Sequence, residues 1–307
     1  MNFNKRYYFK NIANETLDII DKGYYINKDR EKVELRELID NAVKGTKLIC
    51  GSTNEEFSSC EDNINDIVNE KKDNYYVSNY SKTNVNTTNH TISVVNNTTI
   101  DTIIELRKKD IGGNIIALNF ASAKSPGGGF QTGANAQEES IARASALYPC
   151  LIRCKEFYEY HKKQESPLYS NNMIYSPNVP IFRDDKGNLL SNPILCSFIT
   201  SPAVNAKVAR DRGIKEDVIR ETMKVRIKEI LNLALNKQPK AIVLGAFGCG
   251  VFGNIPKDVA RIFVLELMQK IDRLKNIEVI FAIYDNNGEI INIFSEELKI
   301  LIGEVKC

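Results

Sequence analysis

Apolar and polar positions divide most of the chain into short strands and longer amphipathic helices that follow one another in alternation. The clearest amphipathic stretch, Lys215–Lys237, carries apolar residues at every third or fourth position, which is typical of a helix with one buried face. The apolar runs of strand length are Thr91–Val95, Asn114–Phe120, Ile194–Thr200, Lys240–Phe247 and Ile277–Tyr284. Strands that alternate with helices of about 10 to 20 residues predict an α/β sandwich around a largely parallel sheet.

Several segments depart from this alternation. Residues 1–45 contain two runs of helical periodicity separated near Gly23, a residue suited to a helix C-cap, so we expect an N-terminal helical extension. Residues 52–90 are rich in Asn, Ser, Thr, Asp and Glu, which predicts a polar insertion or loop. Tyr148–Pro149 is expected to interrupt a helix, and Met173–Phe182, which holds two prolines, is expected to form irregular or edge structure.

The composition narrows the classes of function without specifying one. Of the 307 residues, 43% are hydrophobic and 26% are charged, as in ordinary globular proteins. Lys and Arg total 41 against 39 Asp and Glu, and this even balance argues against duplex nucleic-acid binding as the main activity. The apolar runs are too short to cross a bilayer, and the N-terminal residues lack the apolar core of a signal peptide. Seven cysteines at scattered spacing fit reduced thiols, so we expect a cytoplasmic protein.

The first candidate site is a glycine-rich loop between a predicted strand and a predicted helix. Gly127–Gly129 follow the strand that ends at Phe120, and the helix from Ala136 carries Glu138 and Glu139 in its first turn. Consecutive glycines let the backbone approach a ligand closely, and a helix N-terminus favours a phosphate. Carboxylates next to a phosphate are electrostatically unfavourable, so their presence indicates a catalytic site and not a site for binding alone. The alternatives are a glycine turn without a ligand and two solvated glutamates that balance the helix dipole.

The second candidate site is the glycine-rich segment after the strand Lys240–Phe247. Gly248, Gly250 and Gly253 fit the G-x-G-x-x-G pattern of dinucleotide-binding folds, with Asp285 as the ribose-binding acid in that interpretation. However, only roughly 50 residues follow the motif, whereas a Rossmann domain needs several further strands after it. Because both glycine loops follow strands, they are better explained as two loops at the carboxyl edge of one sheet. Their backbone amides could then wrap a diphosphate from both sides.

Both loops resemble a known family. Pro126–Gly129 followed by Gln137–Glu139 looks like the signature of poly(ADP-ribose) glycohydrolases, and more narrowly of the microbial-type branch. Thr200–Ala206 and Gly245–Asn254 also resemble this branch, whereas residues 52–90 do not. The resemblance implies a three-layer α/β/α macrodomain with a mixed, largely parallel sheet. In this organisation the N-terminal helical extension covers residues 1–45, and a macrodomain-like catalytic domain covers residues 46–307.

The resemblance also implies roles for single residues. Glu139 matches the family's catalytic acid and base, and Glu138 matches the companion that holds ribose hydroxyls. The two glycine loops match the diphosphate-binding loops, Phe252 the aromatic that positions the distal ribose, and Asn119 an asparagine near that ribose. The substrate-binding residues implied in this way are Asn119, Gly127, Gly128, Gly129, Gln137, Gly248, Cys249, Gly250, Val251 and Phe252.

The chemistry of the residues fits the same function. Adjacent helical residues point about 100° apart, so Glu138 and Glu139 cannot flank a bond symmetrically as in most glycosidases. One carboxyl acting first as acid and then as base suits this geometry. We therefore expect hydrolysis of ribose–ribose O-glycosidic bonds with release of ADP-ribose. The alternatives are a mono-ADP-ribosyl hydrolase acting on protein or nucleic-acid acceptors and a non-catalytic ADP-ribose reader.

The remaining expectations concern cofactors and partners. His90 and His161, the only histidines, fit no metal or triad spacing, so we expect no metal and no cofactor. The expected ligand is ADP-ribose or poly(ADP-ribose), and an ADP-ribosylated protein or nucleic acid is a further candidate substrate. We expect no membrane partner, and we expect a monomer.

Overall fold

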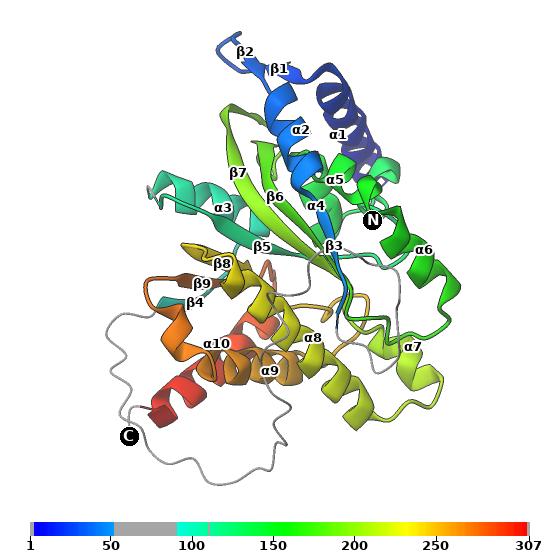
Figure 1. The fold of residues 1–307 in the computed structure, drawn as a ribbon, viewed down its shortest axis with the longest axis vertical. Coiled ribbons are helices and arrows are strands. Elements are labelled where there is room, and N and C mark those ends of the chain that lie inside the picture. Colours follow the sequence, from blue (N-terminus) through cyan, green and yellow to red (C-terminus); the bar gives the residue numbers. More distant parts are fainter. Residues whose placement is uncertain (1–2, 52–90, 110, 306–307) are drawn as a thin grey trace.

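A mixed seven-stranded sheet organises the part of the chain that the computed structural model describes, which is residues 3–51, 91–109 and 111–305 (Figure 1). The predicted polar insertion at 52–90 lies outside the described residues. In spatial order the strands are β3 (Lys47–Ile49), β6 (Met173–Arg183), β7 (Leu189–Ser201), β5 (Ile115–Phe120), β8 (Ala241–Leu244), β9 (Glu278–Ala282) and β4 (Thr91–Val95). The five strands from β7 to β4 run parallel, whereas β6 and β3 are antiparallel to their neighbours.

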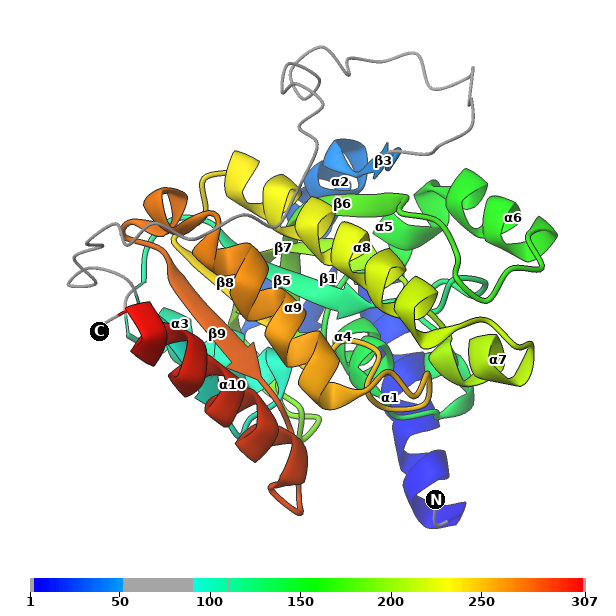
Figure 2. The same cartoon turned by 90° about the horizontal axis from the view of Figure 1, so that it is seen from below.

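Helices cover both faces of this sheet, and the alternation of side chains along the strands shows why. In β5, Ile115 and Ala117 pack into the core on one face, whereas Ile116 and Leu118 pack into the core on the other. The first face is covered by α2 (Arg36–Gly45), α3 (Thr99–Lys108), α4 (Gln137–Ala144), α5 (Leu147–Arg153) and α6 (Lys155–Lys163). The second is covered by α7 (Ala206–Asp211), α8 (Glu216–Asn236), α9 (Pro256–Met268) and α10 (Glu289–Val305), as Figure 2 shows for α8 to α10. The predicted three-layer α/β/α architecture with a mixed, largely parallel sheet is confirmed.

The N-terminal segment forms more than the two expected helices. Helix α1 (Phe3–Lys22) ends before Gly23, whose φ of 76° is the left-handed conformation of a helix C-cap. A two-stranded antiparallel hairpin of β1 (Tyr24–Ile26) and β2 (Lys32–Glu34) then leads to α2. The sequence did not reveal this hairpin because its strands have only three residues each.

Two local predictions were wrong, and proline explains both. Met173–Phe182 belongs to β6, an 11-residue strand inside the sheet between β3 and β7. A register shift between Ser176 and Val179 accommodates Pro177 without ending the strand. The helix break also lies elsewhere than at Tyr148–Pro149. Helix α4 ends at Ala144, with Ser145 as its C-cap, whereas Pro149 is the third residue of α5, where no intrahelical partner for a backbone N–H exists.

The topology places the candidate loops at one edge of the sheet. Since β4, β5, β8 and β9 are parallel, the segments that follow them all emerge at the carboxyl edge of these strands. These segments lead into α3, α4, α9 and α10, respectively. Among the helices that the structure describes, none combines the length and apolar character needed to cross a membrane.

Candidate active site

The first glycine loop folds directly onto both glutamates. Gly128 has a φ of 59°, so the backbone adopts a left-handed conformation that favours glycine. A Cβ atom at this position would lie 2.9 Å from Cδ of Glu139, closer still to its Oε1, and 3.2 Å from Oε2 of Glu138. The absence of a side chain at Gly128 therefore allows the loop to contact the two carboxyl groups.

Glu138 is buried, with 3% of its surface exposed, and it is anchored to the end of β5. The Ser122 N–H donates to its Oε2 at 2.7 Å, and Nδ2 of Asn119 donates to its Oε1 at 3.3 Å. Burial raises the pKa of Glu138 to about 8, with the charge of Glu139 adding to the effect and the Ser122 hydrogen bond opposing it. The raised pKa favours the protonated form of Glu138 near neutral pH. The burial of Glu138 and its hydrogen bonds to the end of β5 exclude the alternative of two solvated glutamates.

Glu139 lies in a different environment, although it is the next residue of α4. Its Oε1 accepts a hydrogen bond from the Gly129 N–H and its Oε2 accepts one from the Ala136 N–H, both at 3.0 Å. The side chain is only partly buried. Two backbone donors from two sides fix the orientation of this carboxyl group, which suits a residue that must transfer protons at a defined position.

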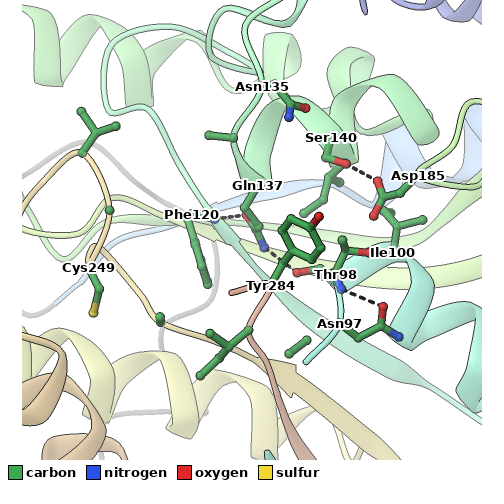
Figure 3. A pocket seen from close by; sticks show the side chains of 18 of the residues that line it. Asn97, Thr98, Ile100, Phe120, Asn135, Gln137, Ser140, Asp185, Cys249 and Tyr284 are labelled. Atoms are coloured by element: carbon green, nitrogen blue, oxygen red, sulfur yellow. Dashed lines mark hydrogen bonds between the residues drawn. The ribbon is translucent and has the colours of Figure 1, made fainter. Parts of the chain in front are cut away.

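Gln137 connects three elements at the start of the same helix. Its Oε1 accepts from the Phe120 N–H at 2.8 Å, and its Nε2 donates to the Leu118 carbonyl at 2.7 Å and to Oγ1 of Thr99 at 3.1 Å. Both amide hydrogens are thus bonded within the protein. The side chain of Gln137 holds the N-termini of α3 and α4 against the end of β5 (Figure 3).

The second glycine loop is tied to the segment between β7 and α7. Asn254 Nδ2 donates to the carbonyls of Val204 and Gly248, at 2.7 and 3.0 Å. Beyond this anchor, Gly250 has open space around its Cα, and Val251 is 87% exposed. Burial raises the pKa of the Cys249 thiol to about 12, so this residue is not an activated nucleophile.

A cavity of about 740 Å³ joins the second loop to the helix that carries the glutamates. Gly248–Phe252 line one side of it, and Asn135, Ala136, Gln137 and Ser140 of the α4 region line another. Glu138, Glu139 and the first glycine run are not part of this lining. The two glutamates lie next to the cavity, because Gln137 before them and Ser140 after them are lining residues.

The cavity also has lining residues that sequence reasoning missed. Figure 3 shows Phe120 from the end of β5, Tyr284 from the segment after β9 and Thr98 from the start of α3 around the same space. Tyr284 is 69% exposed. Lys5 and Tyr8 of α1 also contribute, so the N-terminal segment forms part of the cavity wall. Position at a strand end was the available signal for Phe120 and Tyr284, whereas no local pattern marked the residues of α1.

The dinucleotide-binding alternative fails at Asp285. Its Oδ2 accepts from the Ile290 N–H at 2.7 Å and its Oδ1 from the Asn287 N–H at 3.1 Å. The carboxylate thus satisfies backbone donors at the start of α10, and the hydrogen bonds lower its pKa against the opposing effect of burial. Asp285 has a structural role in place of the ribose-binding role that a Rossmann fold would give it.

The fold and the site together define a macrodomain with two glycine loops and a glutamate pair at the carboxyl edge of its sheet. The family profile described as "Microbial-type PARG, catalytic domain" matches residues 13–184. The chain therefore belongs to the microbial-type poly(ADP-ribose) glycohydrolase family, as the sequence motifs predicted. Among curated proteins, none matches the chain.

Solved structures agree with this assignment. Poly(ADP-ribose) glycohydrolase from Thermomonospora curvata, bound to the inhibitor ADP-HPD, is 31% identical over 94% of this chain and 99% of its own, with a TM-score of 0.77. The enzyme from Deinococcus radiodurans in complex with ADP-ribose is 39% identical over 69% of this chain and 85% of its own, with a TM-score of 0.64. In another crystal form of that complex the match covers 88% of this chain at 33% identity, with a TM-score of 0.69.

Proposed function

We propose that this chain is a poly(ADP-ribose) glycohydrolase that hydrolyses ribose–ribose O-glycosidic bonds and releases ADP-ribose. The observation that carries the proposal is the packing of the Gly128 backbone against both Glu138 and Glu139. This arrangement brings a loop suited to a diphosphate together with two carboxyl groups, one buried beside β5 and one bonded to the loop backbone. The relatives that bind ADP-ribose or ADP-HPD support the same ligand for this chain.

We place the diphosphate between the two glycine loops, Gly127–Gly129 and Gly248–Val251. The distal ribose then lies near Asn119, Glu138 and Phe252. In support, Nδ2 of Asn119 donates to Glu138, so this residue is held beside the glutamate, and its Oδ1 has no hydrogen-bond partner among the described residues. Protonated Glu138 can donate a hydrogen bond to a ribose hydroxyl without adding negative charge beside the diphosphate.

We place the nucleobase in the part of the cavity that is lined by Phe120, Tyr284 and the start of α3. Phe120 and Tyr284 offer aromatic surfaces there, and the start of α3 near Asn97 and Thr98 offers polar groups. An exposed tyrosine at the rim of a cavity is suited to stacking on a planar base. The extension (residues 1–45) and the catalytic domain (46–307) would both contribute, because Lys5 and Tyr8 line the same cavity.

In the proposed reaction Glu139 acts twice. It first protonates the oxygen that leaves the distal ribose, while the glycosidic bond breaks with oxocarbenium character. The resulting carboxylate then accepts a proton from the water that attacks the same carbon. The Gly129 and Ala136 N–H groups keep the carboxyl group in place between the two steps. A reader of ADP-ribose would not need this arrangement.

The proposed cellular form is a monomer in the cytoplasm. Among the described residues, the free thiols of Cys150, Cys154, Cys196 and Cys249 are in keeping with a reducing compartment. ADP-ribosylated proteins and nucleic acids are the candidate carriers of the polymer.

The test compares wild type with Glu139→Gln on three substrates: poly(ADP-ribose), a protein carrying single ADP-ribose units, and DNA modified in the same way. We expect wild type to release ADP-ribose mainly from the polymer, and we expect Glu139→Gln to release none while binding ADP-ribose within a few-fold of wild type. Glu159→Gln, a change of an exposed glutamate on α6, is the matched control and should keep full activity. Wild-type turnover in Glu139→Gln would exclude the proposed mechanism, and release only from single-unit substrates would exclude the polymer as substrate.

A further inference from the structure

The loop between α6 and β6 contains a tyrosine in an unfavourable backbone conformation. Tyr169 has a φ of 56°, which places a bulky residue in the left-handed region that non-glycine residues rarely adopt. Such a conformation persists only where surrounding contacts hold it, and it is enriched at functional sites. The neighbouring groups show which contacts these are.

A buried arginine holds the backbone around Tyr169. Arg226 of α8 is 1% exposed. Its guanidinium donates to the carbonyls of Leu168 at 2.9 Å, Tyr169 at 3.4 Å and Pro202 at 2.9 Å, and to Oδ1 of Asn171 at 3.2 Å. All four acceptors are neutral, and three of them belong to the loop. Burying a cation for this purpose fixes the loop against α8 and the end of β7.

A buried histidine holds the same loop from the other side. His161 of α6 is fully buried, and burial lowers its pKa to about 4, so the ring is neutral. Its Nε2 lies 2.9 Å from Oγ of Ser170, and its Nδ1 lies 2.8 Å from the Phe157 carbonyl. The loop is thus constrained on both sides of Tyr169.

The constrained ring contacts an aromatic residue of the second glycine loop. The ring centroids of Tyr169 and Phe252 are 6.1 Å apart at an interplanar angle of 42°, within the range of favourable aromatic pairs. The Tyr169 ring also contacts the ring of His161, with centroids 5.7 Å apart at an interplanar angle of 83°. On the backbone side, the Phe252 carbonyl accepts from the Lys207 N–H at 2.9 Å. Phe252 is therefore fixed through its carbonyl and through the ring of Tyr169.

We propose that Tyr169 is a positioning residue for the hydrolysis: its ring holds Phe252 in the orientation that the distal ribose requires. Arg226 and His161 maintain the left-handed backbone that directs the ring to Phe252. The inference rests on the proposed function, because it gives Phe252 its role at the ribose. It predicts that turnover depends on the Tyr169 ring. The unfavourable backbone conformation serves only to orient this ring toward Phe252.

The substitution Tyr169→Gly tests the role of the ring independently of the backbone conformation. Tyr169→Gly removes the ring but adopts a positive φ without strain, so we expect its melting temperature to stay within about 4 °C of wild type. We expect its kcat on poly(ADP-ribose) to fall about 10- to 100-fold, with less than about a five-fold change in ADP-ribose affinity, because misplaced groups impair the transition state more than binding. Tyr169→Phe retains the ring and should stay within about three-fold of wild-type kcat.

A control substitution at another residue with a positive φ and a double variant complete the test. Gln238, between α8 and β8, also has a positive φ of 49° and is exposed, so Gln238→Gly relieves similar strain with no expected change in activity. If Tyr169 acts through Phe252, Tyr169→Gly in a Phe252→Ala background should cause less than about a two-fold further loss. Should Tyr169→Gly fail to fold, Tyr169→Asn replaces it, since asparagine tolerates the left-handed region.

The outcomes separate this inference from the proposed function. A wild-type protein that releases no ADP-ribose from polymer contradicts the function, whatever the variants do. If wild type is active and Tyr169→Gly folds with undiminished kcat, the positioning role is wrong and the function stands. Fully multiplicative losses in the double variant would likewise overturn the claim that Tyr169 acts through Phe252.

Discussion

Gly128→Ala adds one methyl group at the contact between the first glycine loop and the two glutamates. The added Cβ would lie 2.9 Å from Cδ of Glu139 and 3.2 Å from Oε2 of Glu138, whereas ordinary van der Waals contacts begin at 3.4 Å. The carboxyl group of Glu139 must therefore retreat by at least about 0.5 Å, and its Oε1 by more. This movement weakens the hydrogen bonds from Gly129 and Ala136 that orient the carboxyl group.

The added methyl group should lower both the stability of the protein and its catalytic rate. The first effect is conformational, because an L-residue at a φ of 59° is less stable than glycine by about 1–2 kcal/mol. In a protein of this size such a change lowers the melting temperature by roughly 2–6 °C. The second concerns catalysis. Since a displacement near 1 Å at a reacting group costs about 100-fold in rate, we expect kcat/KM to fall by about that factor.

Gly213→Ala is the control that carries only the first effect. Gly213 lies between α7 and α8 with a φ of 74°, and a Cβ there would meet nothing within 4 Å. Thermal melts and polymer hydrolysis, measured on both variants, should show similar losses of stability but full activity in Gly213→Ala alone. Equal activities in two folded variants would refute the argument that close packing of Gly128 on Glu139 is required for catalysis.

Two further predictions concern Glu138 and Tyr284. The pKa of Glu138 is raised from its usual 4.5 to about 8, so the folded state binds its proton more tightly than the unfolded chain does. The resulting stabilisation is fully present below the unfolded pKa and is lost as the pH rises toward about 8, with a slope of up to about 1.4 kcal/mol per pH unit. Denaturant melts between about pH 5 and pH 8 should show this slope in wild type and a flatter curve in Glu138→Gln; parallel curves would contradict the raised pKa. Tyr284→Ala should weaken ADP-ribose binding about 5- to 100-fold by calorimetry, because it removes a stacking surface, and unchanged affinity would exclude this position for the base.

The fold was predictable to the extent that its signals are local. The apolar runs that became β5, β8 and β9 are buried on both faces, so their composition alone indicated central parallel strands. Strand β6 was missed because Pro177 and Pro180 are unfavourable inside a sheet. Its register shift, which depends on the neighbouring β7, makes them acceptable. No property of residues 173–183 alone could have shown that compensation.

The site residues that lie together in a sequence motif were predictable, whereas those contributed singly by distant segments were not. The glycine runs and the glutamate pair are contiguous, and their order after a strand and before a helix placed them at the sheet edge. By contrast, Tyr8 and Tyr284 come from opposite ends of the chain and line the same cavity because α1 packs against the α4 region. Tyr169 is similar, since its backbone conformation depends on Arg226 from a helix more than 50 residues away.

The sequence could not distinguish the two glutamates physically, because both occupy the first turn of one helix with the same neighbours. Their difference arises from the surroundings: Glu138 faces the end of β5 and is enclosed by Asn119 and Ser122, whereas Glu139 faces the loop and is bonded to two N–H groups. Burial raises the pKa of Glu138 to about 8, which favours its protonated form near neutral pH. In the proposed complex, a protonated Glu138 would not repel the diphosphate as a carboxylate would. Under the proposed function, this accounts for an anion-binding glycine loop beside two acidic residues, which was the apparent contradiction in the motif.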